Sequence, residues 1–127
     1  MKELKEITLN FLSECEGYHQ LCKGLHWSTS NKAEHLLVDN IDDEVLSFQD
    51  RVAEAVMGMT NDKFGIGELK TLLPNSKTVE SMLNELEEDT LSFKDGIGED
   101  NKRSGLINIL DELLESINKF KYLRTLK

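Results

Sequence analysis

The sequence has little proline, few aromatic residues and no long apolar run. Pro74 is the single proline in 127 residues, so long helices are permitted almost everywhere in the chain. No apolar run approaches the ~20 residues that a membrane-crossing helix needs, and the acidic start lacks the apolar stretch of a signal peptide. We therefore expect one domain over residues 1–127, located in the cytoplasm and not in a membrane.

Cysteine is scarce as well. Cys15 and Cys22 are seven residues apart, which places their Cα atoms ~10 Å apart along one helix. That separation is too large for a disulfide bond. We expect both side chains to be small buried apolar groups.

Positive charge is in deficit, because 15 basic residues stand against 24 acidic ones and the net charge is −9. Binding to phosphates depends on an excess of Lys and Arg, so we expect DNA binding to be weak or absent. A negative surface suits cationic partners, although the same charge also serves solubility alone. Charge alone therefore decides little about function.

Apolar residues recur at spacings of three and four, the period of an amphipathic helix, in four segments. The expected helices span about residues 2–27, 32–59, 78–94 and 100–126. Asn31 has the character of an N-cap for the second helix. A short helix at about 67–73 precedes Pro74. Two hairpins and one long crossover between the second and third helices predict an all-α four-helix bundle, with a short helix in the crossover.

Five residues of metal-ligating type are expected on or beside the inward face: His26, His35, Asp39, Asp50 and Glu54. His35 and Asp39 are four residues apart, so they project ~6 Å apart from one side of the helix. Asp50 and Glu54 repeat this spacing. Eleven residues separate Asp39 from Asp50, and three helical turns return them to nearly the same azimuth.

One chain cannot close these ligands around one ion. Asp39 and Asp50 are ~16 Å apart along the helix, whereas a metal–ligand bond is ~2 Å. An antiparallel second copy would bring its Asp50 and Glu54 opposite His35 and Asp39, and two-fold symmetry would create two equal sites. His26, at the end of the first helix, is near enough in sequence to join. Imidazole and carboxylate ligands together suit Fe(II), Mn(II) or Zn(II).

Three strings, Leu25-His26-Trp27, His35-Leu-Leu-Val-Asp39 and Asp50-Arg-Val-Ala-Glu54, resemble the ferroxidase signature of the Dps family, the dodecameric mini-ferritins of the ferritin-like class. The resemblance implies an iron-binding and iron-storage protein that oxidises Fe(II) with hydrogen peroxide or oxygen. It also implies a homo-oligomer, a dodecamer built from dimers, whose sites are shared between two subunits. One chain would supply His26, His35 and Asp39, and its partner Asp50 and Glu54.

The chain departs from the family pattern in two respects. The interval from His26 to His35 is nine residues, which is shorter than usual and requires a tight loop. The Lys-rich N-terminal extension of the family is missing, which again predicts weak DNA association.

Other interpretations remain open. Glu16 and His19 form a lone ExxH motif, but classical di-iron bundles need a second ExxH, which this sequence lacks. A bundle of this ancestry could instead serve as a structural or virion-associated assembly protein with a vestigial or purely structural metal site. A dimer stabilised by zinc or manganese without turnover is the third possibility.

Overall fold

The computed structural model describes residues 3–126, and within this range it contains helices and no strand. The elements are α1 (Leu4–Ser28), α2 (Lys32–Thr60), α3 (Val79–Ile97), the short 3-10 helix η1 (Asn101–Arg103) and α4 (Ser104–Arg124). The prediction of an all-α four-helix bundle is confirmed, and the helix bounds fall within a few residues of those expected. Lys2, the expected start of the first helix, lies outside the described residues.

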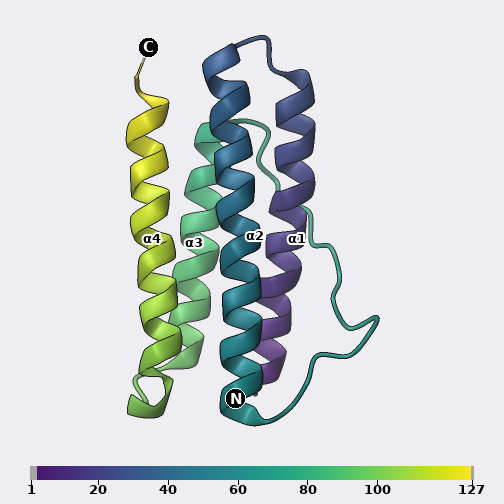
Figure 1. Cartoon of the computed structure of the whole chain (residues 1–127), viewed down its shortest axis with the longest axis vertical. Helices are drawn as coiled ribbons and strands as arrows, with labels where there is room; N and C mark the ends of the chain where they lie inside the picture. The colour runs from purple at the N-terminus through teal and green to yellow at the C-terminus, as the bar shows by residue number, and fades with distance from the viewer. Residues whose placement is uncertain (1–2, 127) are drawn as a thin grey trace.

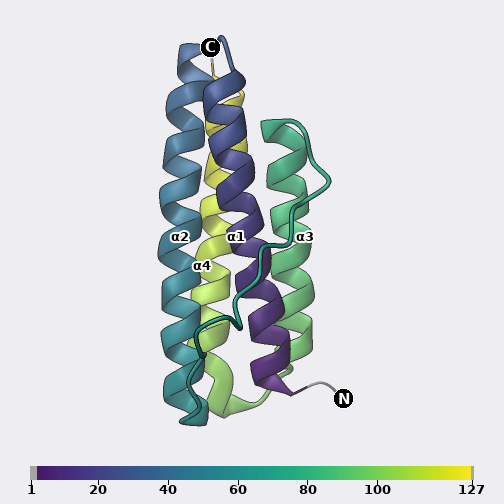
Figure 2. The same ribbon diagram turned by 90° about the vertical axis from the view of Figure 1, so that its right-hand side faces the viewer.

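The four helices pack side by side into one bundle (Figures 1 and 2). α1 packs against α2 and α3, and α4 packs against the same two helices, so α1 and α4 are diagonal neighbours. α3 runs in the same direction as α2, as Figure 1 shows, because the connection between them returns along the length of the bundle. None of the helices between residues 3 and 126 has the length and apolar composition needed to cross a membrane.

One hydrophobic core joins all four helices. Both cysteines belong to it, and Cys15 and Cys22 are free and buried, as predicted. The start of α2 is also as predicted, because the side chain of Asn31 accepts a hydrogen bond from the backbone N–H of Glu34 at 3.1 Å. α1 ends at Ser28 and α2 begins at Lys32, so the connection between them is as tight as the sequence requires.

The prediction of a short helix in the crossover at about 67–73 is wrong. Residues 61–78 contain a turn at 66–68 but no helix, and Gly67 in the turn has a positive φ of 88°. The backbone N–H groups of Lys70 and Leu72 donate to the side chain and carbonyl of Ser13 on α1, each at 3.0 Å. Because an isolated helix of about seven residues is barely stable, these contacts with α1 replace local helical hydrogen bonds.

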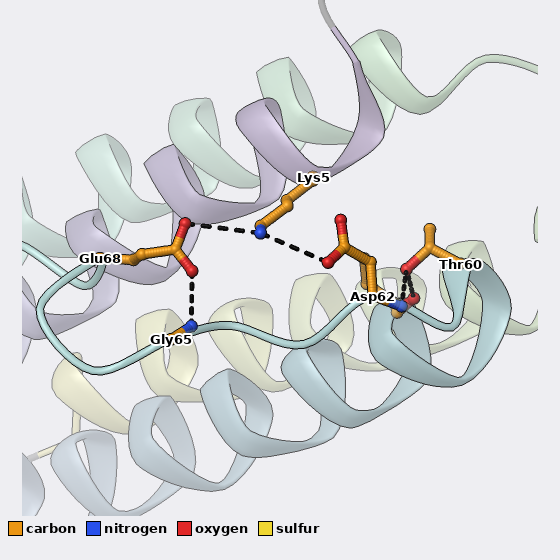
Figure 3. Close-up of polar contacts among 6 residues, drawn as sticks. Lys5, Thr60, Asp62, Gly65 and Glu68 are labelled. Atoms are coloured by element: carbon orange, nitrogen blue, oxygen red, sulfur yellow. Dashed lines mark hydrogen bonds and ion pairs between the residues drawn. The ribbon is translucent and has the colours of Figure 1, made fainter.

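The crossover is fixed at both ends as well as along α1. At its start, the Lys5 ammonium lies 3.5 Å from carboxylate oxygens of both Asp62 and Glu68 (Figure 3). At its end, the Glu85 carboxylate accepts hydrogen bonds from the backbone N–H groups of Asn75 and Ser76 at 3.2 and 3.0 Å. Figure 2 shows the segment lying across α1 on its way to the start of α3, which leaves the outer face of α2 uncovered.

Candidate metal centre

The α1–α2 hairpin brings two of the predicted ligands into direct contact. His26 lies in the last turn of α1, and His35 lies in the first turn of α2. Their rings stack with centroids 3.7 Å apart and an interplanar angle of 22°. The nine-residue interval between the two histidines is therefore long enough for their imidazole rings to come into contact.

Both rings use the same nitrogen for their contacts within the chain. His35 Nδ1 lies 2.9 Å from the backbone carbonyl of His26, and His26 Nδ1 lies 3.4 Å from the carbonyl of His35. A carbonyl can only accept a hydrogen bond, so Nδ1 carries the proton and the lone pair of a neutral ring lies on Nε2. This is the tautomer of a histidine that binds a metal through Nε2 while a neighbouring oxygen orients the ring.

Asp39 completes this half of the predicted site. Its Oδ1 lies 2.9 Å from His26 Nδ1, and the side chain keeps a relative exposure of 56%. The carboxylate therefore orients His26 and still presents oxygen to solvent. His26, His35 and Asp39 are thus brought together within one chain, and we call them the half-site.

Asp50 and Glu54 do not join the half-site of their own chain. Both lie further along α2 and are exposed, and Asp50 borders a small hollow of about 200 Å³ beside the crossover. Within residues 3–126 no group of three or more His, Cys, Asp or Glu side chains surrounds a common point where a metal ion could sit. A single chain therefore presents two separate parts of the predicted ligand set.

The expected position of the carboxylates beside the inward face is wrong. The buried residues of α2 are Val38, Ile41, Val45, Phe48, Val52 and Val56, whereas Asp39, Asp50 and Glu54 are exposed on the opposite side. The eleven-residue spacing correctly places Asp39 and Asp50 on one face. That face is turned to solvent, where only another molecule could cover it.

The lone ExxH motif divides between two unrelated contacts. Glu16 Oε1 accepts a hydrogen bond from the Gln49 amide at 2.9 Å, and His19 Nδ1 lies 2.7 Å from Asp42 Oδ1. The His19–Asp42 pair was not foreseen from the sequence. It repeats the His26–Asp39 contact between the same two helices. The available signal was the order of the two pairs, which is reversed between α1 and α2 as an antiparallel hairpin requires.

A second polar cluster lies between α1 and α3, away from the predicted ligands. Tyr18 donates its hydroxyl proton to Asp89 Oδ2 at 2.5 Å. Burial, and then the nearby Asp89 carboxylate, raise the pKa of Glu14 to about 8, and burial also raises the pKa of Asp89. A proton is therefore retained between these carboxyl groups at neutral pH. No spacing rule links residues 71 positions apart in the chain, so sequence reasoning missed them.

Comparison with family models, with curated proteins and with solved structures finds no match to this chain. The function of the half-site and of the carboxylates of α2 therefore rests on their own chemistry.

Proposed function

We propose that this chain is an iron-binding ferroxidase of Dps type, which binds Fe(II) as its substrate between two paired subunits. His26, His35 and Asp39 of one chain would bind the metal together with Asp50 and Glu54 of the partner subunit. The observation that carries the proposal is the pair of stacked imidazoles, each held through Nδ1 and each left with Nε2 as its free nitrogen.

The position of the remaining carboxylates supports a shared site. Asp50 and Glu54 are exposed on the same side of α2 as Asp39, and an antiparallel α2 from a second copy would carry them to the half-site. One two-fold axis then completes two equivalent sites at once. The resulting set of imidazole and carboxylate ligands fits Fe(II) and also admits Zn(II) or Mn(II) as substitutes.

The chemistry assigned to the residues is modest. For each pair of Fe(II) ions oxidised, two electrons pass to hydrogen peroxide, which takes up two protons and leaves as two water molecules. Oxygen is the alternative oxidant. The anionic carboxylates stabilise the higher charge of Fe(III), and the acidic surface attracts cations toward the site. Fe(III) is then passed on for storage in a homo-oligomer built from dimers, with a dodecamer as the leading expectation.

Rapid mixing of Fe(II) with the oxidant tests the proposal, with Fe(III) formation followed by absorbance. His35→Ala should abolish the rapid phase, because it removes one imidazole from every site. His19→Ala is a matched control, since the His19 ring is likewise held by an oxygen at Nδ1, that of the Asp42 carboxylate, but lies outside the proposed ligand set. Equal rapid oxidation by the wild type and His35→Ala would overturn the assignment.

One observation favours a second candidate. Asp39 contacts His26 Nδ1, in the manner of a carboxylate that supports a histidine ligand rather than binding the metal itself. Such an arrangement also fits a structural zinc or manganese site in a dimer without turnover, or in an assembly protein. Tight Zn(II) binding that depends on His35, with no iron oxidation above that in buffer, would favour this alternative.

A further inference from the structure

The outer face of α2 carries a row of four carboxylates. Asp39, Asp43, Asp50 and Glu54 are all exposed, and at 100° per residue they project within about 60° of one another. Ser47, also exposed, fills the gap in the row. We call these four acidic residues the acidic stripe. Asp43 is its only member outside the proposed ligand set.

No basic side chain of α2 lies within the acidic stripe. Lys32 is exposed on the same side of α2, but it stands at the start of the helix, about two turns before the first carboxylate of the row. Arg51 is engaged elsewhere, because its guanidinium lies 2.6 Å from the Glu112 carboxylate on α4 and 5.0 Å from the centroid of the Phe48 ring. Among residues 3–126, Asp43 forms no ion pair.

Both ends of this face carry apolar groups that an antiparallel pair of chains would bring into contact. They therefore point to a second copy of the chain as the molecule that covers this face. At one end, each histidine of the half-site is followed in sequence by an exposed large apolar residue, Trp27 at 77% and Leu36 at 52%. At the other end, Leu9, Leu12, Ala53 and Leu69 line the hollow beside Asp50. An antiparallel copy brings these apolar ends to the same level, together with the half-site and the carboxylates that complete it.

The register of this pairing places Asp43 close to the two-fold axis. In the proposed site, His35 lies opposite the partner's Glu54, and Asp39 lies opposite the partner's Asp50. The midpoint of each pair along α2 falls about one and a half residues beyond Asp43. The two Asp43 residues would then be only ~4.5 Å apart along the helix direction, between helix axes ~8–10 Å apart. Eight carboxylates of two acidic stripes would face each other with no basic side chain of α2 among them.

We propose that pairing of two copies through α2 is conditional on metal, and that Asp43 enforces this condition. The proposal rests on the proposed shared site. Without metal, the facing acidic stripes repel each other. Bound cations offset most of the charge of the six carboxylates that act as ligands, which leaves the two Asp43 residues as the main repulsion that metal binding has to overcome. A chain without metal therefore stays apart, and metal loading assembles it.

Analytical ultracentrifugation of the full chain tests this, first after chelation and then with Zn(II) as a probe that does not change oxidation state. The wild type should be monomeric without metal and paired with Zn(II). Asp43→Asn should tighten pairing in the absence of metal by at least about fivefold. Added salt should also promote pairing of the metal-free wild type, because it screens the stripe. Asp95→Asn is the matched control, since it makes the same charge change at an exposed position on α3.

The outcomes separate this inference from the proposed function. Pairing of the wild type that is equally tight with and without metal, in a protein that oxidises iron, would overturn the role of Asp43 alone. The same holds if Asp43→Asn, with unchanged helical content, depends on metal as strongly as the wild type does. A chain that neither pairs with Zn(II) nor oxidises Fe(II) would overturn the proposed function, and this inference with it.

Discussion

His35 donates its Nδ1 proton to the backbone carbonyl of His26 at 2.9 Å, while the two rings stack at 3.7 Å. The contact fixes three properties at once: the angle between the end of α1 and the start of α2, the tautomer of His35, and the direction of its free nitrogen. A ligand orientation that a metal would otherwise have to impose is already present in the single chain. Such preorganisation lowers the entropic cost of binding.

Mixing of two inactive variants tests the division of ligands between chains. His35→Ala and Asp50→Ala should each abolish rapid iron oxidation in homo-oligomers. In a heterodimer of the two, one shared site collects both defects and the other regains a complete ligand set. Co-refolded mixtures should therefore recover about half of the wild-type activity per heterodimer, measured by the rate of Fe(III) formation.

The control for this experiment is a mixture of His35→Ala with Asp39→Ala. Both lesions fall in the half-site, so each of the two sites in a heterodimer keeps one defect and no activity should return. Recovery in the control mixture, or its absence from verified heterodimers of His35→Ala and Asp50→Ala, contradicts a site shared between subunits.

Glu14 should make stability depend on pH. Its pKa is raised from 4.5 to about 8 in the folded chain, so between these values the folded chain keeps a proton that the unfolded chain has lost. The free energy of unfolding therefore falls as pH rises from about 4.5 to about 8, and this contribution then stays level. Glu14→Gln should reduce the slope and stabilise the chain at about pH 8 by on the order of 1 kcal/mol, a figure reduced for the partial exposure of Glu14.

Urea unfolding at several pH values measures this effect. Glu115→Gln is the control, because Glu115 is exposed on α4 and the same loss of one negative charge there should leave the slope unchanged. A wild-type stability that rises between about pH 5 and about pH 8, by an amount that Glu14→Gln abolishes, would reverse the assigned sign.

Gly17 and Gly24 of α1 should respond oppositely to the same substitution. A Cβ at Gly17 would lie 1.8 Å from the Leu72 carbonyl oxygen, whereas nothing lies within 4 Å of one at Gly24. Gly17→Ala should displace the crossover and destabilise the chain by about 1–3 kcal/mol. Gly24→Ala should stabilise it by up to about 1 kcal/mol through helix propensity.

Chemical denaturation gives both free energies, and hydrogen exchange locates the change. The Leu72 amide, which donates to the Ser13 carbonyl, should lose protection in Gly17→Ala and keep it in Gly24→Ala. Unchanged protection of Leu72 in Gly17→Ala would show that the crossover does not need this close approach.

DNA binding should be weak. With a net charge of −9, the chain has few basic groups to replace the counterions of DNA, so the dissociation constant at physiological salt should be on the order of 10⁻⁴ M or weaker. Fluorescence anisotropy with a labelled duplex measures it. A submicromolar complex at that salt would indicate a basic surface that the charge balance conceals.

The sequence predicted the features that depend on spacing within one helix or across one short loop. The four helices follow from apolar periodicity, and Asn31 caps α2 as its residue type suggests. The half-site follows from His26 standing at the end of one helix and His35 near the start of the next. The spacing of Asp39 and Asp50 correctly indicated a common face.

The features that were missed depend on contacts between distant segments. The crossover is extended because Ser13, 57 residues from Lys70, accepts hydrogen bonds from the crossover backbone. The helix propensity of the crossover residues gives no information about such a distant partner. Periodicity also shows that two residues share a face without showing which way the face points, and the carboxylates of α2 point outward. The Tyr18–Asp89 contact depends on how α1 and α3 are placed against each other along the bundle, which no motif encodes.

The shortness of the α1–α2 connection has a consequence for synthesis of the chain. His26 and His35 are only nine residues apart, whereas the Tyr18–Asp89 contact spans 71. Contacts between nearby residues form sooner because little chain entropy is lost in closing them. On the ribosome, the histidine pair can close as soon as the first hairpin has emerged, before α3 and α4 exist. A nascent chain would thus present its free imidazole nitrogens to metal ions while the rest of the bundle is still being made.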